Sequence, residues 1–259
     1  VTHEAKNTYS DDGASASDDR DGNVTSSIST SGSVDINKIG SYTITYAVSD
    51  AAGNAAATVT RTVNVVDTTK PVIALTGNSS VTHEAATQYV DKGATASDTY
   101  DGSSVSVTSN ADSVVDVNKV GTYIVTYSAS DAAGNSAASV TRTVNVVDTT
   151  IPEITVTGDS SVTHEAATQY VDKGATASDT YDGSSVSVTS NADSVVNVNK
   201  VGTYIVTYSA SDAAGNKAEE KTRTVTVSDK TAPIITLIGS GTVSHEAATE
   251  YVDKGATAK

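Results

Sequence analysis

Apolar and polar residues alternate along much of the chain, which is the pattern of strands with one buried face. The stretch TYIVTYSAS at residues 122–130 places Tyr123, Val125, Tyr127 and Ala129 on one face at a period of two. Further strands are predicted at residues 71–77, 80–85, 89–97, 103–109 and 138–147. No segment has the period of an amphipathic helix, so we expect no helix.

Turn residues punctuate these strands. The sequence DAAGN at residues 131–135 predicts a hairpin turn, because glycine and asparagine tolerate positive φ. Gly93 interrupts a predicted strand and indicates a bulge or bend. About seven short strands in each 80 residues or so, with frequent turns, indicate an all-β fold of the β-sandwich type.

The pattern repeats along the chain. His3, His83, His164 and His245 each begin a His-Glu-Ala run, spaced by 80, 81 and 81 residues. Residues 81–135 and 162–216 differ at a single pair of positions, Asp116 and Asn197. A period of this size is long enough for a small domain with its own core. We therefore predict one domain at residues 1–70 without its first strand, then domains at 71–151 and 152–232, and the start of a fourth repeat at 233–259.

The joints between repeats are short. They read VVDTTKP at 65–71, VVDTTIP at 146–152 and VSDKTAP at 227–233. Each leaves only about three residues between the last strand of one domain and the first strand of the next, too few for a flexible tether. We therefore expect neighbouring domains almost to touch and to form tandem β-sandwiches arranged as an extended rod.

Composition narrows the possible partners. The 31 acidic residues exceed the 16 basic ones and give a net charge of −15. Such a surface repels nucleic acid and anionic membranes and attracts cations. The absence of cysteine excludes disulfides and thiolate metal sites. No apolar run reaches the length of a membrane span, so we expect no membrane insertion in this segment.

These motifs together resemble a known domain type. Residues 71–77, 93–102, 119–135 and 142–148 carry a Pro-x-Ile-x-Leu-x-Gly strand, an Asp-x-x-Asp-Gly loop, a Gly-Thr-Tyr sequence and an Arg-Thr-Val strand. The combination resembles the bacterial immunoglobulin-like domains strung together in large surface proteins and adhesins. The resemblance implies a sandwich fold, a stalk role outside the cell or on its surface and, in many members, calcium at or near the joints. Gly-Thr-Tyr also resembles a tyrosine corner.

Acidic residues are predicted to gather at each joint. In such a sandwich the first strand begins at the end that carries the BC and FG loops. Asp98, Asp101 and Asp131 should therefore converge on Asp67 of the linker. The same logic groups Asp179, Asp182 and Asp212 with Asp148, and gives the corresponding acids of the first repeat and the last linker as Asp18, Asp21, Asp50 and Asp229.

A cation would relieve the repulsion among these acids. Close like charges repel by about 1 kcal/mol per pair even at water-like screening, and calcium takes six to eight oxygen ligands. The alternative is that the aspartates only cap turns, since DTYDG lacks the EF-hand spacing and Asp131 alone is more typical of a turn. For the group we favour calcium as the cofactor that stiffens the joints. Asp91 belongs near the opposite end and could serve the following joint.

Other chemistry is weakly supported. Turn-mounted acids without a cleft do not suit a glycosidase, so we expect no enzyme. The HEA runs lack the second histidine of a zinc motif and are expected to be solvent-facing pairs. Tyr100 and Tyr181 are expected to cover the joints.

The best interpretation is a structural stalk segment of a bacterial surface adhesin or extracellular fibre. Its partners are neighbouring repeats of the same chain. Two alternatives remain. One is a filament in which residues 233–239 donate a strand head-to-tail to a like chain, and the other is a module that binds glycans or host cells.

Overall fold

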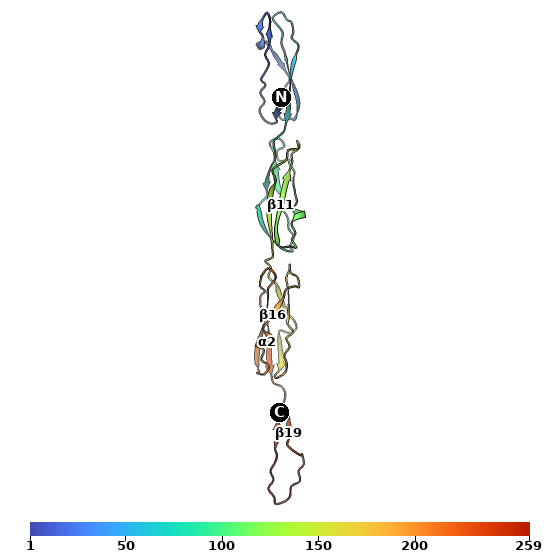
Figure 1. The fold of residues 1–259 in the computed structure, drawn as a ribbon, viewed down its shortest axis with the longest axis vertical. Helices are drawn as coiled ribbons and strands as arrows, with labels where there is room; N and C mark the ends of the chain where they lie inside the picture. Colours follow the sequence, from blue (N-terminus) through green and yellow to red (C-terminus); the bar gives the residue numbers. More distant parts are fainter. The chain divides into compact units, whose positions relative to one another are not determined.

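A computed structural model describes residues 1–259, and strands follow one another along most of the chain (Figure 1). The chain forms two compact units, Val1–Val147 and Asp148–Lys259. The first unit holds the first two repeats, and the second holds the third repeat and the beginning of the fourth. The predicted all-β class with tandem immunoglobulin-like sandwiches is confirmed.

The second repeat shows the architecture most completely. Its strands are β7 (Val72–Leu75), β8 (Ser80–Glu84), β9 (Ala94–Ser97), β10 (Val107–Ser109), β11 (Gly121–Ala129) and β12 (Val140–Val147). One sheet has the order β10-β11-β12-β8, and β7 pairs with β9 in a second, smaller sheet. Strand β8 runs parallel to β12, whereas the other pairs are antiparallel.

The third repeat has the same arrangement. Its strands are β13 (Glu153–Val156), β14 (Ser161–Glu165), β15 (Ala175–Ser178), β16 (Val188–Ser190), β17 (Gly202–Ala210) and β18 (Lys221–Ser228). They form a β14-β18-β17-β16 sheet and a β13-β15 pair. In the fourth repeat β19 (Ile235–Leu237) pairs with β20 (Ala256–Ala258).

The first repeat keeps the larger sheet but has a different small one. Its strands are β1 (Thr2–Glu4), β2 (Ser17–Asp18), β3 (Gly22–Asn23), β4 (Ser29–Ser31), β5 (Gly40–Ala47) and β6 (Val59–Val66). The order β1-β6-β5-β4 matches the larger sheets of the later repeats, while β2 pairs with β3.

Two expectations about the elements were wrong. Each of the second and third repeats has six strands rather than seven, and a single helical turn, α1 (Ala111–Val114) or α2 (Ala192–Val195), lies before the long β11 or β17 strand. The first repeat has a 3₁₀ turn, η1 (Thr25–Ser27). One turn is too short to show a helical period in sequence. In the second repeat the Asn110 side chain accepts the backbone N–H of Thr126 at 2.8 Å and holds the turn against β11.

The strand predicted over residues 89–97 begins only at Ala94. Gly93 has a φ of 73°, so the chain bends there as its glycine suggested. Residues 89–92 therefore lie outside the sheet, and the side chain of Asp91 is largely buried and pairs with Arg142.

The predicted inner face of β11 is confirmed. Val125 and Tyr127 are fully buried and Ala129 is 7% exposed. Val144 of β12 lies in the same core. The hydroxyl of Tyr123 donates to the Lys119 carbonyl at 2.7 Å, which is the contact expected of a tyrosine corner. Tyrosine thus supplies the large core side chain in a protein without Phe or Trp.

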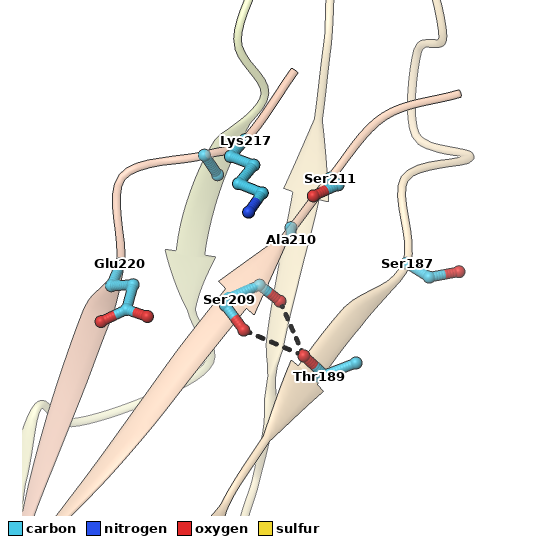
Figure 2. Close-up of a pocket in the computed structure, with 8 residues that line it drawn as sticks. Ser187, Thr189, Ser209, Ala210, Ser211, Lys217 and Glu220 are labelled. Atoms are coloured by element: carbon cyan, nitrogen blue, oxygen red, sulfur yellow. Dashed lines mark hydrogen bonds between the residues drawn. The ribbon is translucent and has the colours of Figure 1, made fainter. Parts of the chain in front are cut away.

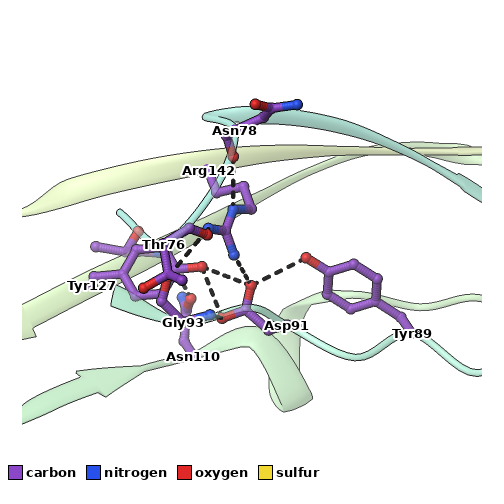
Figure 3. Close-up of polar contacts among 9 residues, drawn as sticks. Thr76, Asn78, Tyr89, Asp91, Gly93, Asn110, Tyr127 and Arg142 are labelled. Carbon is purple, nitrogen blue, oxygen red and sulfur yellow. Dashed lines mark hydrogen bonds and ion pairs between the residues drawn. The ribbon is translucent and has the colours of Figure 1, made fainter. Parts of the chain in front are cut away.

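A buried arginine connects the layers (Figure 3). Arg142 of β12 is 1% exposed and forms an ion pair with Asp91. It also donates to the carbonyls of Thr76 at 2.6 Å and Asn78 at 3.0 Å, just beyond β7. Tyr127 of β11 donates its hydroxyl to both oxygens of Asp91, at 2.7 and 2.8 Å. The network therefore joins both sheets through hydrogen bonds to a charged pair.

This network corrects the expectation that Asp91 serves a joint. Burial alone would raise the pKa of Asp91, but hydrogen bonds from Tyr127 and Arg142 hold that pKa below its ordinary value. The third repeat has the same pair in Arg223 and Asp172. In the first repeat Arg61 pairs with Asp11, but the arginine side chain is 25% exposed and the aspartate 23%.

Replacing Arg142 with methionine should destabilise the second repeat by about 3–5 kcal/mol, because the buried Asp91 loses its countercharge. Hydrogen exchange of the β11 and β12 amides measures the effect. The matched control is Arg61→Met in the first repeat, which should cost less because that pair is partly hydrated. Equal losses in the two repeats would contradict a special role for burial.

Candidate metal centre

The centre begins at the linker aspartate. Asp67 directly follows β6 and is 6% exposed. Its Oδ1 accepts the backbone N–H of Thr69 at 3.1 Å and the Thr69 hydroxyl at 2.7 Å. Its Oδ2 is buried and has no hydrogen-bond partner. An unsatisfied buried carboxylate oxygen is costly unless a further group binds it.

The loop after β9 brings two more carboxylates to the linker. Asp98 and Gly102 pair through both of their backbone groups, at 2.8 and 3.0 Å, and Gly102 has a φ of 62°. Asp98 Oδ1 accepts the N–H groups of Tyr100 at 2.7 Å and Asp101 at 3.2 Å. Asp98 Oδ2 accepts the hydroxyl of Thr69 at 2.9 Å. The loop is thus folded back on itself with its acids facing the linker.

These three acids form a compact group. One carboxylate oxygen from each of Asp67, Asp98 and Asp101 lies within 4.8 Å of the others. Asp131 is not one of these three acids, and both of its oxygens accept hydrogen bonds from Asn135, at 2.7 and 2.8 Å. Asn135 also donates to the Asp67 carbonyl at 3.1 Å. Asp131 therefore anchors the turn that holds the linker backbone.

The second unit contains an equivalent group. The carboxylates of Asp148, Asp179 and Asp182 approach one another within 4.8 Å. Asp148 is 7% exposed, and one oxygen each of Asp148 and Asp179 is buried without a hydrogen-bond partner. Asn216 donates to the Asp148 carbonyl at 3.1 Å and to Asp212 at 2.9 Å, as Asn135 does in the first unit.

The electrostatics of this group favour a cation. Burial raises the pKa of Asp148 above its ordinary value, and the neighbouring carboxylates Asp179, Asp212 and Asp182 raise it further. The donors are all oxygen, without cysteine or histidine in the group. Buried unpaired oxygens in an all-carboxylate set fit a hard cation such as calcium.

The other predicted ligands lack a complete group. Asp18 accepts the N–H groups of Arg20 and Asp21 at 2.8 and 2.9 Å, and Asp50 accepts two hydrogen bonds from Asn54, both at 2.7 Å. These acids line a pocket together with Asp21. Asp229 is exposed and accepts the backbone N–H of Thr231 at 3.1 Å.

Tyr100 covers the first joint, as expected. Its hydroxyl accepts the backbone N–H of Ile39 at 3.3 Å, and the Nζ of Lys6 lies 5.5 Å from its ring centroid. Both contacts reach from the loop of the second repeat to the first. The position of this tyrosine inside the acidic loop was the only signal for its role.

Sequence reasoning missed two kinds of residue at the joints. One is the asparagine at the end of DAAGN, which donates to the linker carbonyl. The other is the glutamate of HEA, since Glu4 accepts the backbone N–H of Thr68 at 3.0 Å and its hydroxyl at 2.6 Å. The recurrence of HEA was a visible signal. Its meaning depends on the parallel pairing of β1 with β6, which alternation does not reveal.

Three of the HEA histidines, His3, His83 and His164, are half-buried rather than solvent-facing, whereas His245 is exposed. The ring Nε2 of His83 hydrogen-bonds the Thr87 carbonyl at 3.1 Å. The ring also packs edge-on against Tyr89, with centroids 5.1 Å apart. His83 is half-buried and secures the turn after β8.

A second concave surface lies on the larger sheet of the third repeat (Figure 2). Thr189 donates its hydroxyl to the Ser209 carbonyl at 3.3 Å, and the two hydroxyls are 3.0 Å apart. Lys217 and Glu220 lie at its margin (Figure 2). The lining residues include no aromatic ring on which a sugar could stack. This surface gives no specific support for glycan binding.

No helix in the structure has the length and apolar character needed to cross a membrane.

Comparison with known proteins identifies similar sequences within longer proteins. Hyalin of Lytechinus variegatus is 35% identical over 223 residues, which cover 79% of this chain and 40% of hyalin. Internalin I of Listeria monocytogenes serotype 4b (strain F2365) is 31% identical over 239 residues, which cover 88% of this chain and 13% of the internalin. The chain therefore spans less than half the length of either relative.

Matches among solved structures have low identity and low TM-scores. The EC1-2 segment of human protocadherin-24 is 17% identical, with a TM-score of 0.33. The match covers 61% of this chain and 99% of that structure.

The match to a family model covers all three longer repeats. The model described as "Bacterial surface protein, Ig-like domain" matches residues 1–65, 73–146 and 154–227. The match agrees with the sandwich repeats and indicates an extracellular or cell-surface protein with a structural or adhesion role. The chain therefore belongs to the bacterial surface protein Ig-like domain family.

Proposed function

We propose that this chain is a stalk segment of a bacterial surface adhesin or extracellular fibre, and that calcium stiffens the joints between its repeats. The observation that carries the proposal is the set of buried, unpartnered oxygens on Asp67, Asp148 and Asp179. Each lies in a group of three carboxylates beside a linker. The role is mechanical rather than enzymatic.

The charge balance supports calcium. Three carboxylates within 4.8 Å repel one another, by about 1 kcal/mol per pair in water and by more where they are shielded from it. Calcium accepts six to eight oxygens in irregular geometry, whereas magnesium demands a regular octahedron and retains water. Backbone carbonyls, the Thr69 hydroxyl and water would complete the shell around Asp67, Asp98 and Asp101.

The placement of the ligands gives the ion its mechanical effect. Asp67 continues directly from β6 of the first repeat, whereas Asp98 and Asp101 belong to the loop after β9 of the second. An ion bound to all three would tie the exit of one repeat to the entrance of the next. Without it, the repelling carboxylates would leave the short linker free to bend.

Two other functions receive less support. Strand donation to a like chain would require β19 to leave its partner β20, with which it pairs over Ile235–Leu237. Adhesion by the repeats themselves would require a recognition surface, and the concave surface of the third repeat lacks an aromatic platform. Both stay predictions.

Small-angle scattering tests the stalk proposal. The full chain should have a larger and better defined maximum dimension in millimolar calcium than in EDTA, because the ion removes bending at the joints. Its melting temperature should also rise modestly, as expected for dissociation constants of about 10⁻⁴ to 10⁻³ M.

A variant with Asp101→Asn and Asp182→Asn provides the control, since it removes one carboxylate from each group and keeps the hydrogen bond between Asp98 and the linker residue Thr69. It should scatter alike with calcium and with EDTA. Calorimetric titration must accompany the scattering. Calcium binding with an unchanged maximum dimension would refute the mechanical role, and no binding at all would refute the calcium centre.

The raised pKa of Asp148 predicts an unusual pH dependence in EDTA. A raised pKa means that the folded state holds the proton more tightly than the unfolded state, so stability is lost as pH rises through the folded pKa. The lowered pKa values of Asp172 and Glu165 act in the opposite sense, but only below the ordinary values of 3.8 and 4.5. Above pH 4.5 the third repeat should therefore lose stability as pH rises.

Urea unfolding followed by the NMR signal of the Val225 amide measures this trend between pH 4.5 and 7. Asp148→Asn should flatten it, and saturating calcium should reverse it because the ion favours the ionised carboxylate. A slope that survives in Asp148→Asn would assign the effect to other groups.

A further inference from the structure

The glutamate of the HEA run contacts the linker at the end of the same repeat. Glu4 is the last residue of β1. Its Oε1 accepts the backbone N–H of Thr68 at 3.0 Å, and its Oε2 accepts the Thr68 hydroxyl at 2.6 Å. Thr68 immediately follows Asp67, the linker aspartate of the candidate metal centre. We call this pair of contacts the linker clamp.

The linker clamp recurs in the third repeat. Glu165, the last residue of β14, accepts the backbone N–H of Lys230 at 3.0 Å and the hydroxyl of Thr231 at 2.8 Å. These residues follow Asp229, the linker aspartate after the third repeat. The clamp is therefore present in two repeats whose linkers differ in sequence.

Strand pairing explains why a glutamate stands at this position. In the parallel pair of β1 and β6, Glu4 lies opposite Val66, the last residue of β6. Glu165 lies opposite Ser228, the last residue of β18, in the same way. The backbone ladder ends there, and the side chain extends the pairing into the linker. The hydrogen bond from the Thr68 hydroxyl is the largest cause that lowers the pKa of Glu4.

We infer that Glu4 is a positioning residue, which holds the linker so that Asp67 meets the cation with little further loss of freedom. The inference rests on the proposed calcium centre and assigns a role to the HEA run. Glu4 is not itself one of the grouped carboxylates, which are Asp67, Asp98 and Asp101. Both of its oxygens are already engaged by Thr68.

The clamp should raise calcium affinity through preorganisation. Fixing the backbone of one residue has an entropic cost equivalent to about a tenfold change in an equilibrium constant. If the clamp has already ordered Thr68, the ion need not meet that cost when it binds. Losing the clamp should therefore weaken binding at the first joint by about tenfold.

The test uses the full chain and an NMR titration with calcium. Gly102 and Gly183 lie in the loops of the two carboxylate groups, so their amide signals report the first and second joints separately. Glu4→Ala should raise the calcium midpoint at Gly102 by about tenfold and leave the midpoint at Gly183 unchanged. Unaltered amide shifts of Val63 and Val65 in the core of the first repeat verify that the variant is folded.

Two further variants separate the clamp from a direct charge or ligand role of Glu4. Glu4→Gln keeps an oxygen for the Thr68 N–H but removes the charge, so most of the affinity should remain. Glu165→Ala breaks the clamp of the third repeat and should alter neither midpoint. Equal losses in Glu4→Gln and Glu4→Ala would overturn the clamp in favour of a charge or ligand role, and an unchanged midpoint in Glu4→Ala would overturn it outright.

The same titration distinguishes failure of the clamp from failure of the calcium centre. If neither glycine responds to calcium in the unaltered chain, the calcium centre itself fails. If both glycines respond but Glu4→Ala binds calcium normally, only the positioning role fails.

Discussion

A buried arginine guanidinium group connects the two sheets in each of the second and third repeats. Arg142 lies on β12, its counterion Asp91 lies on the segment before β9, and its carbonyl acceptors follow β7. A buried charge tolerates few alternative arrangements, because each donor must keep its partner. The protein has no Phe, Trp, Met or Cys, and this polar network together with the core tyrosines defines the sandwich. In the first repeat the more exposed Arg61 pairs with Asp11 and donates to the Gly13 carbonyl at 2.8 Å.

The aspartates at the joints have electrostatic surroundings opposite to those of Asp91 in the interior of a repeat. Asp91 meets an arginine and two tyrosine hydroxyls, so its pKa falls despite partial burial. Asp148 accepts the backbone N–H of Thr150 but has no positively charged partner, and burial and the neighbouring carboxylates raise its pKa. The same residue type therefore stabilises the interior of a repeat and leaves an uncompensated negative charge at its end. The first arrangement is satisfied by the protein alone, whereas the second favours an external cation.

The sequence predicted those features that depend on local pattern. Alternation over residues 122–130 predicted the inner face of β11, and the repeat spacing together with domain topology predicted that Asp67, Asp98 and Asp101 would meet. Features that depend on contacts between residues far apart in the sequence were not predicted. Arg142 and Asp91 are 51 positions apart, and Glu4 and Thr68 are 64 apart. Their contacts depend on which strands lie side by side and in which direction, and residue alternation carries no such information. The helical turn at Ala111–Val114 was too short for its period to be visible.

Each carboxylate group takes its linker aspartate from the end of one repeat and its loop acids from the start of the next. A gene segment that encodes one repeat therefore encodes the loop acids of the group at the start of that repeat. It also encodes the linker aspartate of the group at its end. When such a segment is duplicated or deleted in phase, the halves that meet at the new junction are again complementary. Recombination between near-identical copies can thus change the number of repeats without leaving an incomplete junction. Length becomes a trait that varies in whole repeats and needs no compensating point mutation.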